Sequence, residues 1–204
     1  TRAHPSGTPA QHTISGDYMR LFIAIPVPED VRDRILVDTA EMRGRYPDLK
    51  WTGRDAYHLT LSFLGETEEK MVEPIREAMD KAAINNKTFE MELAGIGSFP
   101  KKGPPRVLYV PVVKGFDETK RLHGSLVRAL GDLGPQERKK FTPHLTLARI
   151  KGKKESPDPR ENGNGLHFSF TCSKLVLYRS HLHPEGARYE VIEESELKRE
   201  EAEK

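Results

Sequence analysis

The tetrapeptide His-Leu-Thr-Leu occurs twice in this sequence, at residues 58–61 and 144–147. The copies start 86 residues apart (144 − 58 = 86), and each follows a segment that we expect to form a helix and a short turn. Both copies alternate between polar and apolar residues, which is typical of a β-strand with one face on a core. Since 204 residues leave room for two such units, the repeat predicts an internal duplication into two similar halves.

Successive side chains of a strand point to opposite faces, which divides each copy into a polar and an apolar set. In the first copy we expect two opposed faces: His58, Thr60 and Ser62 against Leu59, Leu61 and Phe63. In the second copy the corresponding faces are His144, Thr146 and Ala148 against Leu145 and Leu147. The leucines would anchor each strand on a core. If a pseudo-twofold axis relates the halves, the two His–Thr faces can look at each other across a cleft.

The other periodic segments alternate between strands and helices. We expect strands over 20–27, 88–99, 106–113, 166–179 and 188–192, and helices over 28–43, 68–84 and 117–133. Helices are few and fall between strand pairs, and no Gly-x-Gly-x-x-Gly turn is present. This pattern favours an α+β fold with largely antiparallel sheet and helices packed outside it, over a doubly wound parallel sheet.

The two ends of the chain differ from this pattern. Residues 1–18 have no apolar periodicity and are rich in Thr, Ser, Gly, Pro and His, so we expect a disordered leader there. Residues 193–204 are nearly all charged, which predicts a charged tail, either a frayed helix or a solvated end. The expected ordered domain therefore covers residues 19–192.

The composition disfavours several classes of protein. Lys and Arg number 33 against 31 Asp and Glu, a formal charge of +2, so a tail-driven polyanion binder is disfavoured. The single cysteine, Cys172, rules out an internal disulfide framework and a Cys-based zinc finger. No apolar run approaches the roughly 20 residues that a bilayer crossing needs. We expect a cytoplasmic protein without a membrane contact, and we take it to be a monomer.

Two imidazoles and two hydroxyls in one cleft suit a displacement at phosphorus. One group must take a proton from the incoming water while another gives a proton to the leaving oxygen. Histidine, with an ordinary pKa of about 6.5, can do either at neutral pH. Threonine hydroxyls donate hydrogen bonds to non-bridging phosphoryl oxygens, where charge develops. A cyclic phosphodiester is strained and carries its leaving group nearby, so this chemistry does not oblige a metal.

A metal site is the weaker alternative. Zinc sites usually need three protein ligands, and no Asp, Glu or His triad with suitable spacing accompanies His58 and His144. We therefore expect no cofactor. A single His-x-Thr strand is more often a surface feature, and the second, identical copy is what favours a functional pair.

Three segments carry a resemblance to a known family: RLFIAI at 20–25, HLTLSFLGE at 58–66 and HLTLARI at 144–150. The paired motifs resemble those of the two-histidine (2H) phosphoesterase superfamily, and the three segments together resemble its RNA 2′,3′-cyclic phosphodiesterase branch, also called 2′-5′ RNA ligase. The resemblance covers residues 19–192. It implies a bilobal α+β fold with a central cleft, and metal-independent opening of a 2′,3′-cyclic phosphate, on RNA ends or nucleotides, to a 2′-phosphate.

The resemblance also implies roles for individual residues through their positions in the motifs. His58 and His144 would form the acid and base pair, and Thr60 and Thr146 would donate to the phosphate. Arg149, five residues after the second histidine, would contact the phosphate or another part of the substrate. Strict alternation puts Arg149 on the leucine face, so it must lie where the strand twists or ends.

A 2′-phosphate product requires cleavage of the bond to O3′. We favour His144 as the base that activates water and His58 as the acid at O3′. The motifs themselves do not order the two histidines, so the reverse assignment stays open.

Two further residues are candidates for substrate binding. In the segment 20–25, Arg20 and Phe22 lie on the face opposite the apolar Leu and Ile side chains. They could contact phosphate and stack on a base, or Phe22 could simply cover the sheet. The basic loops 101–102 and 151–154 could track an RNA backbone, or be plain solvated surface.

Other functions stay open at this point. RNA 2′-5′ ligation is the reverse reaction on RNA ends, although the abundance of water and the strain of the ring favour hydrolysis. Hydrolysis of linear 2′-5′ linkages is another two-histidine activity. A non-catalytic nucleotide- or RNA-binding module could use the same cleft, although two intact His-x-Thr pairs disfavour it.

The remaining residues of interest are expected to be structural. Tyr57 is expected in the core or at its rim, and His123 as a partly buried histidine on the third helix. His181 and His183 form a His-x-His pair at a strand end, where a metal role is disfavoured. Cys172 lies in an apolar strand without a catalytic partner, which disfavours a nucleophile.

Overall fold

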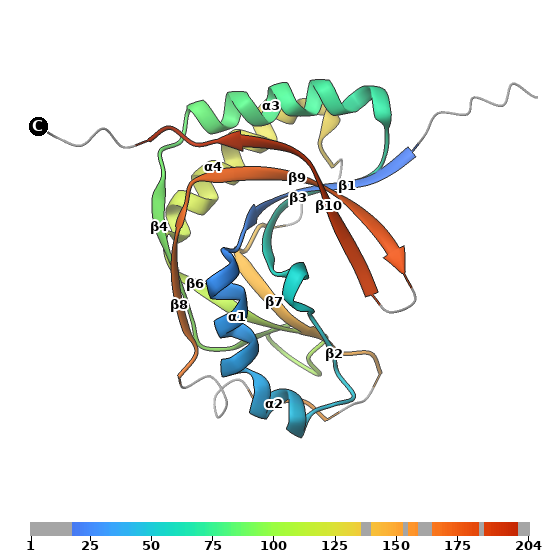
Figure 1. The fold of residues 1–204 in the computed structure, drawn as a ribbon, viewed down its shortest axis with the longest axis vertical. Helices are drawn as coiled ribbons and strands as arrows, with labels where there is room; N and C mark the ends of the chain where they lie inside the picture. The colour runs from blue at the N-terminus through green and yellow to red at the C-terminus, as the bar shows by residue number, and fades with distance from the viewer. Residues whose placement is uncertain (1–17, 136–139, 153–154, 159–164, 184–185, 200–204) are drawn as a thin grey trace, which may run out of the picture.

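The fold consists of two curled antiparallel sheets with helices packed against them (Figure 1). The computed structural model describes residues 18–135, 140–152, 155–158, 165–183 and 186–199. The expected leader lies outside this part, apart from Tyr18, which begins the first strand. The expected α+β fold with largely antiparallel sheet is confirmed.

The first sheet contains the first motif strand, in the order β10-β9-β1-β3. Its strands are β1 Tyr18–Pro26, β3 His58–Glu68, β9 Lys174–His183 and β10 Gly186–Glu196. The second sheet contains the second motif strand, in the order β2-β7-β6-β4-β8, with β5 paired to β6. Its strands are β2 Lys50–Trp51, β4 Phe89–Ala94, β5 Gly97–Phe99, β6 Val107–Lys114, β7 His144–Arg149 and β8 His167–Cys172.

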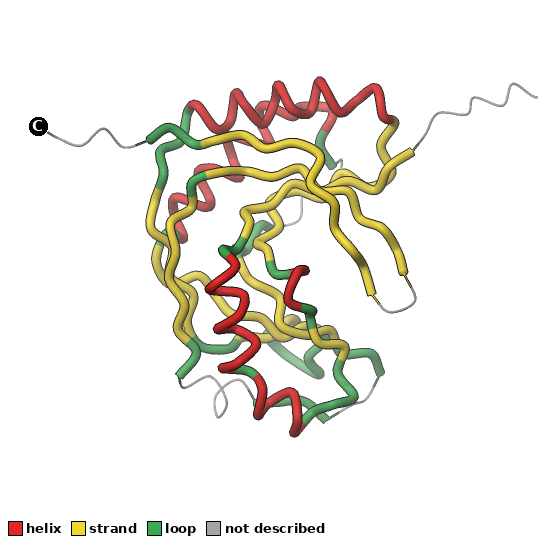
Figure 2. The backbone as a smooth tube through the Cα atoms, viewed as in Figure 1, coloured by secondary structure: helices red, strands yellow, loops and turns green. Residues whose placement is uncertain are grey.

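The helices connect these strands and cover the sheets. In the described part of the chain they are α1 Glu29–Asp38, α2 Ala40–Arg45, α3 Val72–Ile84 and α4 Phe116–Leu130, with 3₁₀ turns at Arg54–Ala56, Glu69–Met71 and Gly131–Leu133. Helix α3 packs against β9, β10 and α4, and α4 also contacts β3, so both helices lie over the first sheet (Figure 2). Helix α1 contacts β8 of the second sheet.

Each sheet takes strands from both halves of the sequence. β1 and β3 lie in one sheet with β9 and β10 from the other end of the chain, and β4 pairs with β8 in the other sheet. The expected strand 166–179 is therefore two strands, β8 and β9, which belong to different sheets and meet around Ser173. Both strands bury alternate side chains, so the apolar pattern continues from one to the other. It therefore did not reveal that the chain changes sheet at Ser173.

Two more expected elements are divided. The expected helix 28–43 is interrupted at Thr39, whose hydroxyl donates to the carbonyl of Ile35 at 2.6 Å. Such a bond from a threonine to the preceding turn is a local alternative that bends or ends a helix. The expected strand 88–99 is interrupted at Gly95, whose φ of 75° suits a residue without a Cβ.

The expected charged tail, 193–204, is wrong for its first residues. Strand β10 runs to Glu196, and Ser195 and Leu197 are buried, with 2% and 3% of their surfaces exposed. β10 lies at the edge of the first sheet, so alternate glutamates face solvent while the residues between them pack inward. Residues 200–204 lie outside the described part.

The leucines of both motif strands share one core. Each has at most 3% of its surface exposed: Leu59, Leu61, Leu145 and Leu147. This burial holds the backbone of both strands against the interior, which leaves the opposite side of each strand available for polar side chains.

Truncating Leu145 to alanine is expected to lower the free energy of unfolding by about 2–5 kcal/mol, because a buried leucine leaves a cavity. Leu145 is 0% exposed, whereas Val37 on α1 is 73% exposed and gives a matched control. Val37→Ala is expected to change the stability by less than about 0.5 kcal/mol. Urea unfolding followed by circular dichroism measures both, and equal losses would show that Leu145 is no more important to the core than an exposed side chain.

Candidate active site

The two motif strands meet although they belong to different sheets. β3 and β7 contact each other. A charge on His144 is near enough to His58 to lower the pKa of His58. The two His-x-Thr strands therefore lie at one site, as a duplicated fold would arrange them.

A cavity of about 590 Å³ lies at this junction, a volume typical of small-ligand sites. Six of the seven residues singled out from the sequence line it: Arg20, Phe22, His58, Thr60, Thr146 and Arg149. The seventh, His144, is half-buried on β7 and lies outside the lining set. Its electrostatic effect on His58 nevertheless puts it close by.

An extra residue interrupts the alternation of the first motif strand. In the ladder between β1 and β3, Ile23 pairs with Ser62 and Ala24 pairs with Thr60, which leaves Leu61 as an additional residue. This is a β-bulge, which bends the strand and changes the direction of the side chains that follow.

The second motif strand carries the same interruption. In the ladder between β6 and β7, Leu108 pairs with Ala148 and Tyr109 pairs with Thr146, which leaves Leu147 as the additional residue. Each bulge stands three residues after the histidine of its motif, so the two repeats share this backbone feature as well as the tetrapeptide.

The bulges overturn three expected orientations and explain a fourth. Ser62 and Ala148 are 5% and 0% exposed, so neither shares the His–Thr face. Phe63, expected on the leucine face, is 61% exposed and lines the cavity. Arg149 reaches the cavity for the same reason, because a bulge re-aims the residues after it. Phe63 is thus a cavity residue that strict alternation missed.

Both bulges have their carbonyls satisfied from outside the regular ladder. His123 of α4 donates from Nδ1 to the carbonyl of Leu61 at 3.0 Å, and its ring stacks on Phe141 at 3.9 Å between centroids. At the second bulge, the backbone N–H of Thr52 donates to the carbonyl of Leu147 at 2.8 Å. His123, expected to be an ordinary helix histidine, therefore connects α4 to the bulge beside the cavity.

An aromatic enclosure surrounds His58. The ring centroids of Phe22, Tyr189 and Tyr178 lie 4.8, 5.2 and 6.0 Å from the centroid of the imidazole. Only 3% of Phe22 is exposed, so of its two expected roles the covering one fits, because the ring has no open face for a base. The tyrosines were not identified from the sequence, since only the pairing of β9 and β10 beside β1 brings them here.

This enclosure determines the charge of His58. Burial, together with the nearby charges of Arg149 and His144, lowers the pKa of its imidazole to about 4. A backbone hydrogen bond with Ala56 acts in the opposite direction. The imidazole is therefore neutral at pH 7.

Two aromatic rings lie next to His144. The ring centroids of Phe99 and Tyr109 lie 5.2 and 5.3 Å from the centroid of its imidazole. Its Nδ1 donates to the carbonyl of Thr142 at 2.8 Å, which leaves Nε2 as the free ring nitrogen. Burial lowers the pKa of His144, the bond to Thr142 raises it, and the charge of Arg149 lowers it.

The other candidate side chains have structural surroundings. Tyr57 is buried, as expected, with 3% of its surface exposed. Burial raises the pKa of the Cys172 thiol to about 12, which disfavours the reactive thiolate. His181 pairs with Glu190 at 2.8 Å on the hairpin of β9 and β10.

Three other expectations concern loops, metals and membranes. Residues 101–102 and, of the loop 151–154, the described residues 151–152 are exposed and lie outside the lining of this cavity. Within the described ranges, no three His, Cys, Asp or Glu side chains gather where they could hold a metal ion. No helix in that part of the chain is both long and apolar enough to cross a membrane.

The fold and the site together define a class of protein, an α+β phosphoesterase-like fold in which two antiparallel sheets bring paired His-x-Thr strands to one cavity. The chain belongs to the family described as LigT like phosphoesterase, which it matches twice, over residues 25–109 and 110–189. Two successive matches agree with an internal duplication.

Curated relatives are similar to this chain over most of its length. It is 35% identical over 151 residues to the RNA 2′,3′-cyclic phosphodiesterase of Aeropyrum pernix, covering 72% of this chain and 85% of that protein. It is 30% identical over 182 residues to the protein of the same name from Methanocaldococcus jannaschii, covering 86% and 99%.

Solved structures show the same fold. The Thermus thermophilus protein TT0787 superposes with a TM-score of 0.72 at 30% identity, covering 90% of this chain and 100% of that one. E. coli LigT, crystallised with 3′-AMP, superposes with a TM-score of 0.74 at 23% identity, covering 89% and 99%.

Replacing His123 with leucine is expected to destabilise the protein by about 1–3 kcal/mol, because the partly buried carbonyl of Leu61 loses its donor. His167→Leu is the matched control, since the side chain of His167 is 60% exposed, and its expected effect is below about 0.5 kcal/mol. Urea unfolding of both variants measures the difference. A loss in the His123 variant no larger than that in the control would show that the bond to the bulge contributes nothing.

Proposed function

We propose that this protein hydrolyses 2′,3′-cyclic phosphates, on RNA ends or on nucleotides, to 2′-phosphates without a metal ion. The observation that carries this proposal is the pair of bulged His-x-Thr strands that meet at one cavity. Membership of the LigT like phosphoesterase family supports the class of reaction. The names of the curated relatives support the cyclic phosphate as the substrate.

The phosphate would lie between Thr60 and Thr146. Each hydroxyl can donate one hydrogen bond to a non-bridging oxygen, and donors that are fixed before the reaction stabilise the charge that develops there. Arg149 adds a planar guanidinium, which matches two phosphate oxygens at once. All three residues line the cavity.

Two proton transfers complete the reaction. As water attacks phosphorus opposite O3′, Nε2 of His144 takes the proton of the water. As the P–O3′ bond breaks, His58 gives a proton to O3′, and the phosphate stays on O2′. Once protonated, the imidazole of His58 would be a strong donor for a departing alkoxide, because its pKa is low.

Binding of the substrate would favour the protonated form that the acid needs, with the proton taken from solvent. Burial lowers the pKa of both His58 and His144, so both are largely neutral in the free enzyme at neutral pH. A phosphodiester anion beside the imidazoles favours their charged form. The aromatic rings exclude water, which strengthens this interaction.

Phe63 would hold the base of the terminal nucleotide. Its ring is an exposed aromatic surface in the cavity lining, and RNA-binding proteins often stack unpaired bases on such rings. Phe63 stands five residues after His58, as Arg149 stands five residues after His144. The two equivalent positions would therefore serve different parts of the substrate, the base and the phosphate.

The test uses an RNA oligonucleotide that ends in a 2′,3′-cyclic phosphate, incubated with the protein in excess EDTA and followed by ³¹P NMR. We expect a 2′-phosphate product. His58→Ala and His144→Ala are each expected to lower the rate by about 10²–10⁴-fold while the protein stays folded. His167→Ala, an exposed histidine on β8, is the control and should keep the wild-type rate.

Each other result has a definite meaning. Near wild-type turnover in either histidine variant would refute the acid and base assignment. A 3′-phosphate product would show that O2′, and not O3′, is the leaving oxygen. Hydrolysis of linear 2′-5′ dinucleotides instead of the cyclic ends would identify a different two-histidine activity. Tight binding of AMP without any turnover would indicate a non-catalytic module.

The pH profile of kcat/KM is expected to peak below pH 6.5. At high pH both imidazoles are neutral and no acid is present, and at low pH both are charged and no base is present. The maximum falls midway between the two pKa values, and burial lowers both from 6.5. The kcat profile should peak at higher pH, because the bound anion raises both pKa values. A kcat/KM maximum above pH 7 would contradict the assignment of these two buried histidines as acid and base.

A further inference from the structure

Tyr189 of strand β10 lines the cavity at the junction of the two motif strands. It is half-buried, and it is the one tyrosine among the described residues of the lining. The steps proposed at phosphorus use two histidines, two threonines and an arginine, and none of them uses this hydroxyl. The surroundings of Tyr189 show which part of the side chain packs against the protein and which part is available to a ligand.

The ring of Tyr189 packs on its neighbours in the first sheet. Its centroid lies 5.0 Å from that of Phe22 and 5.2 Å from that of His58, and both contacts are edge-to-face, with interplanar angles of 76° and 86°. The ring of Tyr178 lies 6.4 Å away. Aromatic pairs in this geometry are favourable, so the ring is held beside the imidazole of His58.

Strand pairing explains why Tyr189 faces the cavity. β10 pairs with β9, where Tyr189 is opposite Ser180, and β9 pairs with β1, where Tyr178 is opposite Phe22. Residues directly opposite each other on paired strands share one face of the sheet. Ser180 also lines the cavity, so the register places Tyr189 and its partner on the same side.

The hydroxyl of Tyr189 has no hydrogen-bond partner in the part of the chain that the structure describes, where the contacts of this side chain are ring contacts. Tyrosine hydroxyls removed from solvent usually have such a partner. Tyr57 shows the usual arrangement, because its hydroxyl accepts a hydrogen bond from Arg43. The hydroxyl of Tyr189 is therefore available to a ligand in the cavity.

Two nearby charges indicate where this hydroxyl lies. Burial raises the pKa of Tyr189, so the hydroxyl stays protonated at neutral pH, and the charges of Arg149 and Arg20 act in the opposite direction. Both arginines line the cavity. Because the hydroxyl is the group that titrates, it lies near these two cavity residues, and in its protonated form it is a hydrogen-bond donor.

Tyr178 packs on the same rings, but its hydroxyl has other neighbours. Its ring centroid lies 5.2 Å from that of Phe22 and 6.0 Å from that of His58. Burial raises the pKa of Tyr178, and the charges near its hydroxyl are those of Arg32 and Glu194. None of these last three residues belongs to the described lining of the cavity. The aromatic enclosure thus contains two tyrosine rings and presents one tyrosine hydroxyl to the cavity.

We propose that the hydroxyl of Tyr189 donates a hydrogen bond to a non-bridging oxygen of the cyclic phosphate, on the side of the cavity where His58 lies. The proposal rests on the proposed function, and it adds a third neutral donor to the hydroxyls of Thr60 and Thr146. The two threonines belong to the repeated motifs, whereas this donor comes from outside both of them. A donor that packing has fixed before the substrate binds stabilises the charge that develops on the phosphate.

The experiment removes the hydroxyl from the full chain and keeps the ring. Tyr189→Phe and the wild-type protein are titrated with uridine 2′-phosphate and with uridine, and binding is followed by NMR. Loss of a hydrogen bond to a charged phosphate should weaken binding of uridine 2′-phosphate about tenfold. Binding of uridine should change less than twofold. For hydrolysis of uridine 2′,3′-cyclic phosphate, kcat/KM should fall about 10–100-fold.

The pH profile separates a lost donor from a change in packing. Tyr189→Phe keeps the ring that helps to bury His58, so the pH at which kcat/KM is maximal should be the same as in the wild-type protein. A shifted maximum would show that the substitution acts through the pKa of His58, and it would overturn the proposed contact with the phosphate.

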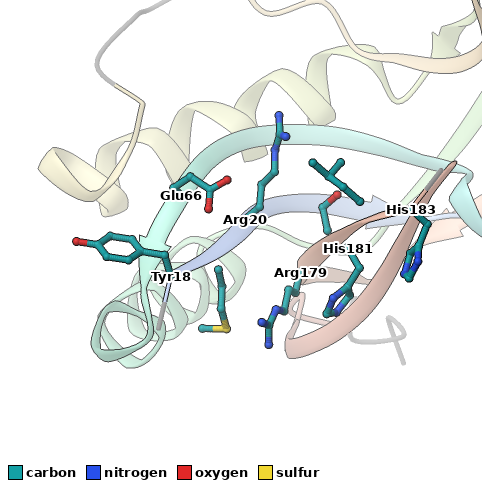
Figure 3. Close-up of a pocket in the computed structure, with 9 residues that line it drawn as sticks. Tyr18, Arg20, Glu66, Arg179, His181 and His183 are labelled. Atoms are coloured by element: carbon teal, nitrogen blue, oxygen red, sulfur yellow. The ribbon is translucent and has the colours of Figure 1, made fainter. Parts of the chain in front are cut away.

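Two other tyrosines provide controls. Tyr178→Phe removes a hydroxyl from the same group of rings and should keep the wild-type ratio of the two affinities. Tyr18 lies at the beginning of β1 in a neighbouring pocket, where its hydroxyl end points away from Arg20 (Figure 3). It is 55% exposed and lies outside the lining of the cavity, so Tyr18→Phe should keep the wild-type kcat/KM.

Three results would overturn the proposal: unchanged binding of uridine 2′-phosphate by Tyr189→Phe, equal weakening of uridine and its phosphate, or the same selective loss in Tyr178→Phe. If the wild-type protein hydrolyses the cyclic phosphate, any of these overturns the role of Tyr189 alone. A wild-type protein without turnover, in which Tyr189→Phe still selectively loses uridine 2′-phosphate, would refute the proposed function and support Tyr189 as a phosphate contact. A wild-type protein that binds uridine 2′-phosphate no more tightly than uridine would overturn both.

Discussion

The cavity depends on a bulge at the equivalent position of each motif strand, Leu61 and Leu147. Without the bulges at Leu61 and Leu147, regular alternation would turn Phe63 and Arg149 into the core. A bulge is stable only if its displaced carbonyl finds a donor, and here the donors come from α4 and from the segment after β2. The shape of the cavity therefore depends on how those two segments pack on the sheets.

Similar backbones carry different surroundings in the two repeats. His58 lies among three aromatic rings of the first sheet, while His144 contacts two rings of the second and donates to a nearby carbonyl. An acid and a base that act in the same step must differ in their tendency to hold a proton. For the proposed acid and base, the unequal enclosures would provide that difference, although the motif residues themselves are identical.

Much of this organisation could be predicted from the sequence, because alternation and repetition are local signals. They were sufficient for the α+β class, for the leucine cores and for the meeting of the two His-x-Thr strands. They failed for Ser62 and Phe63, since a bulge is set by the register with a distant strand. They also missed Tyr189, which is 131 residues from His58 in sequence (189 − 58 = 131) and 5.2 Å away between ring centroids. No local pattern encodes such a pairing.

Because each sheet draws strands from both repeats, neither repeat contains a complete sheet. The first repeat alone would leave open the edge of β1 that β9 covers and the edge of β4 that β8 covers. Open edges of this kind pair with other chains, so a single repeat could close its sheets only by exchanging strands with a second copy. Two repeats in one chain need not be identical, and the equivalent cavity positions indeed differ, with Phe63 in the first repeat and Arg149 in the second.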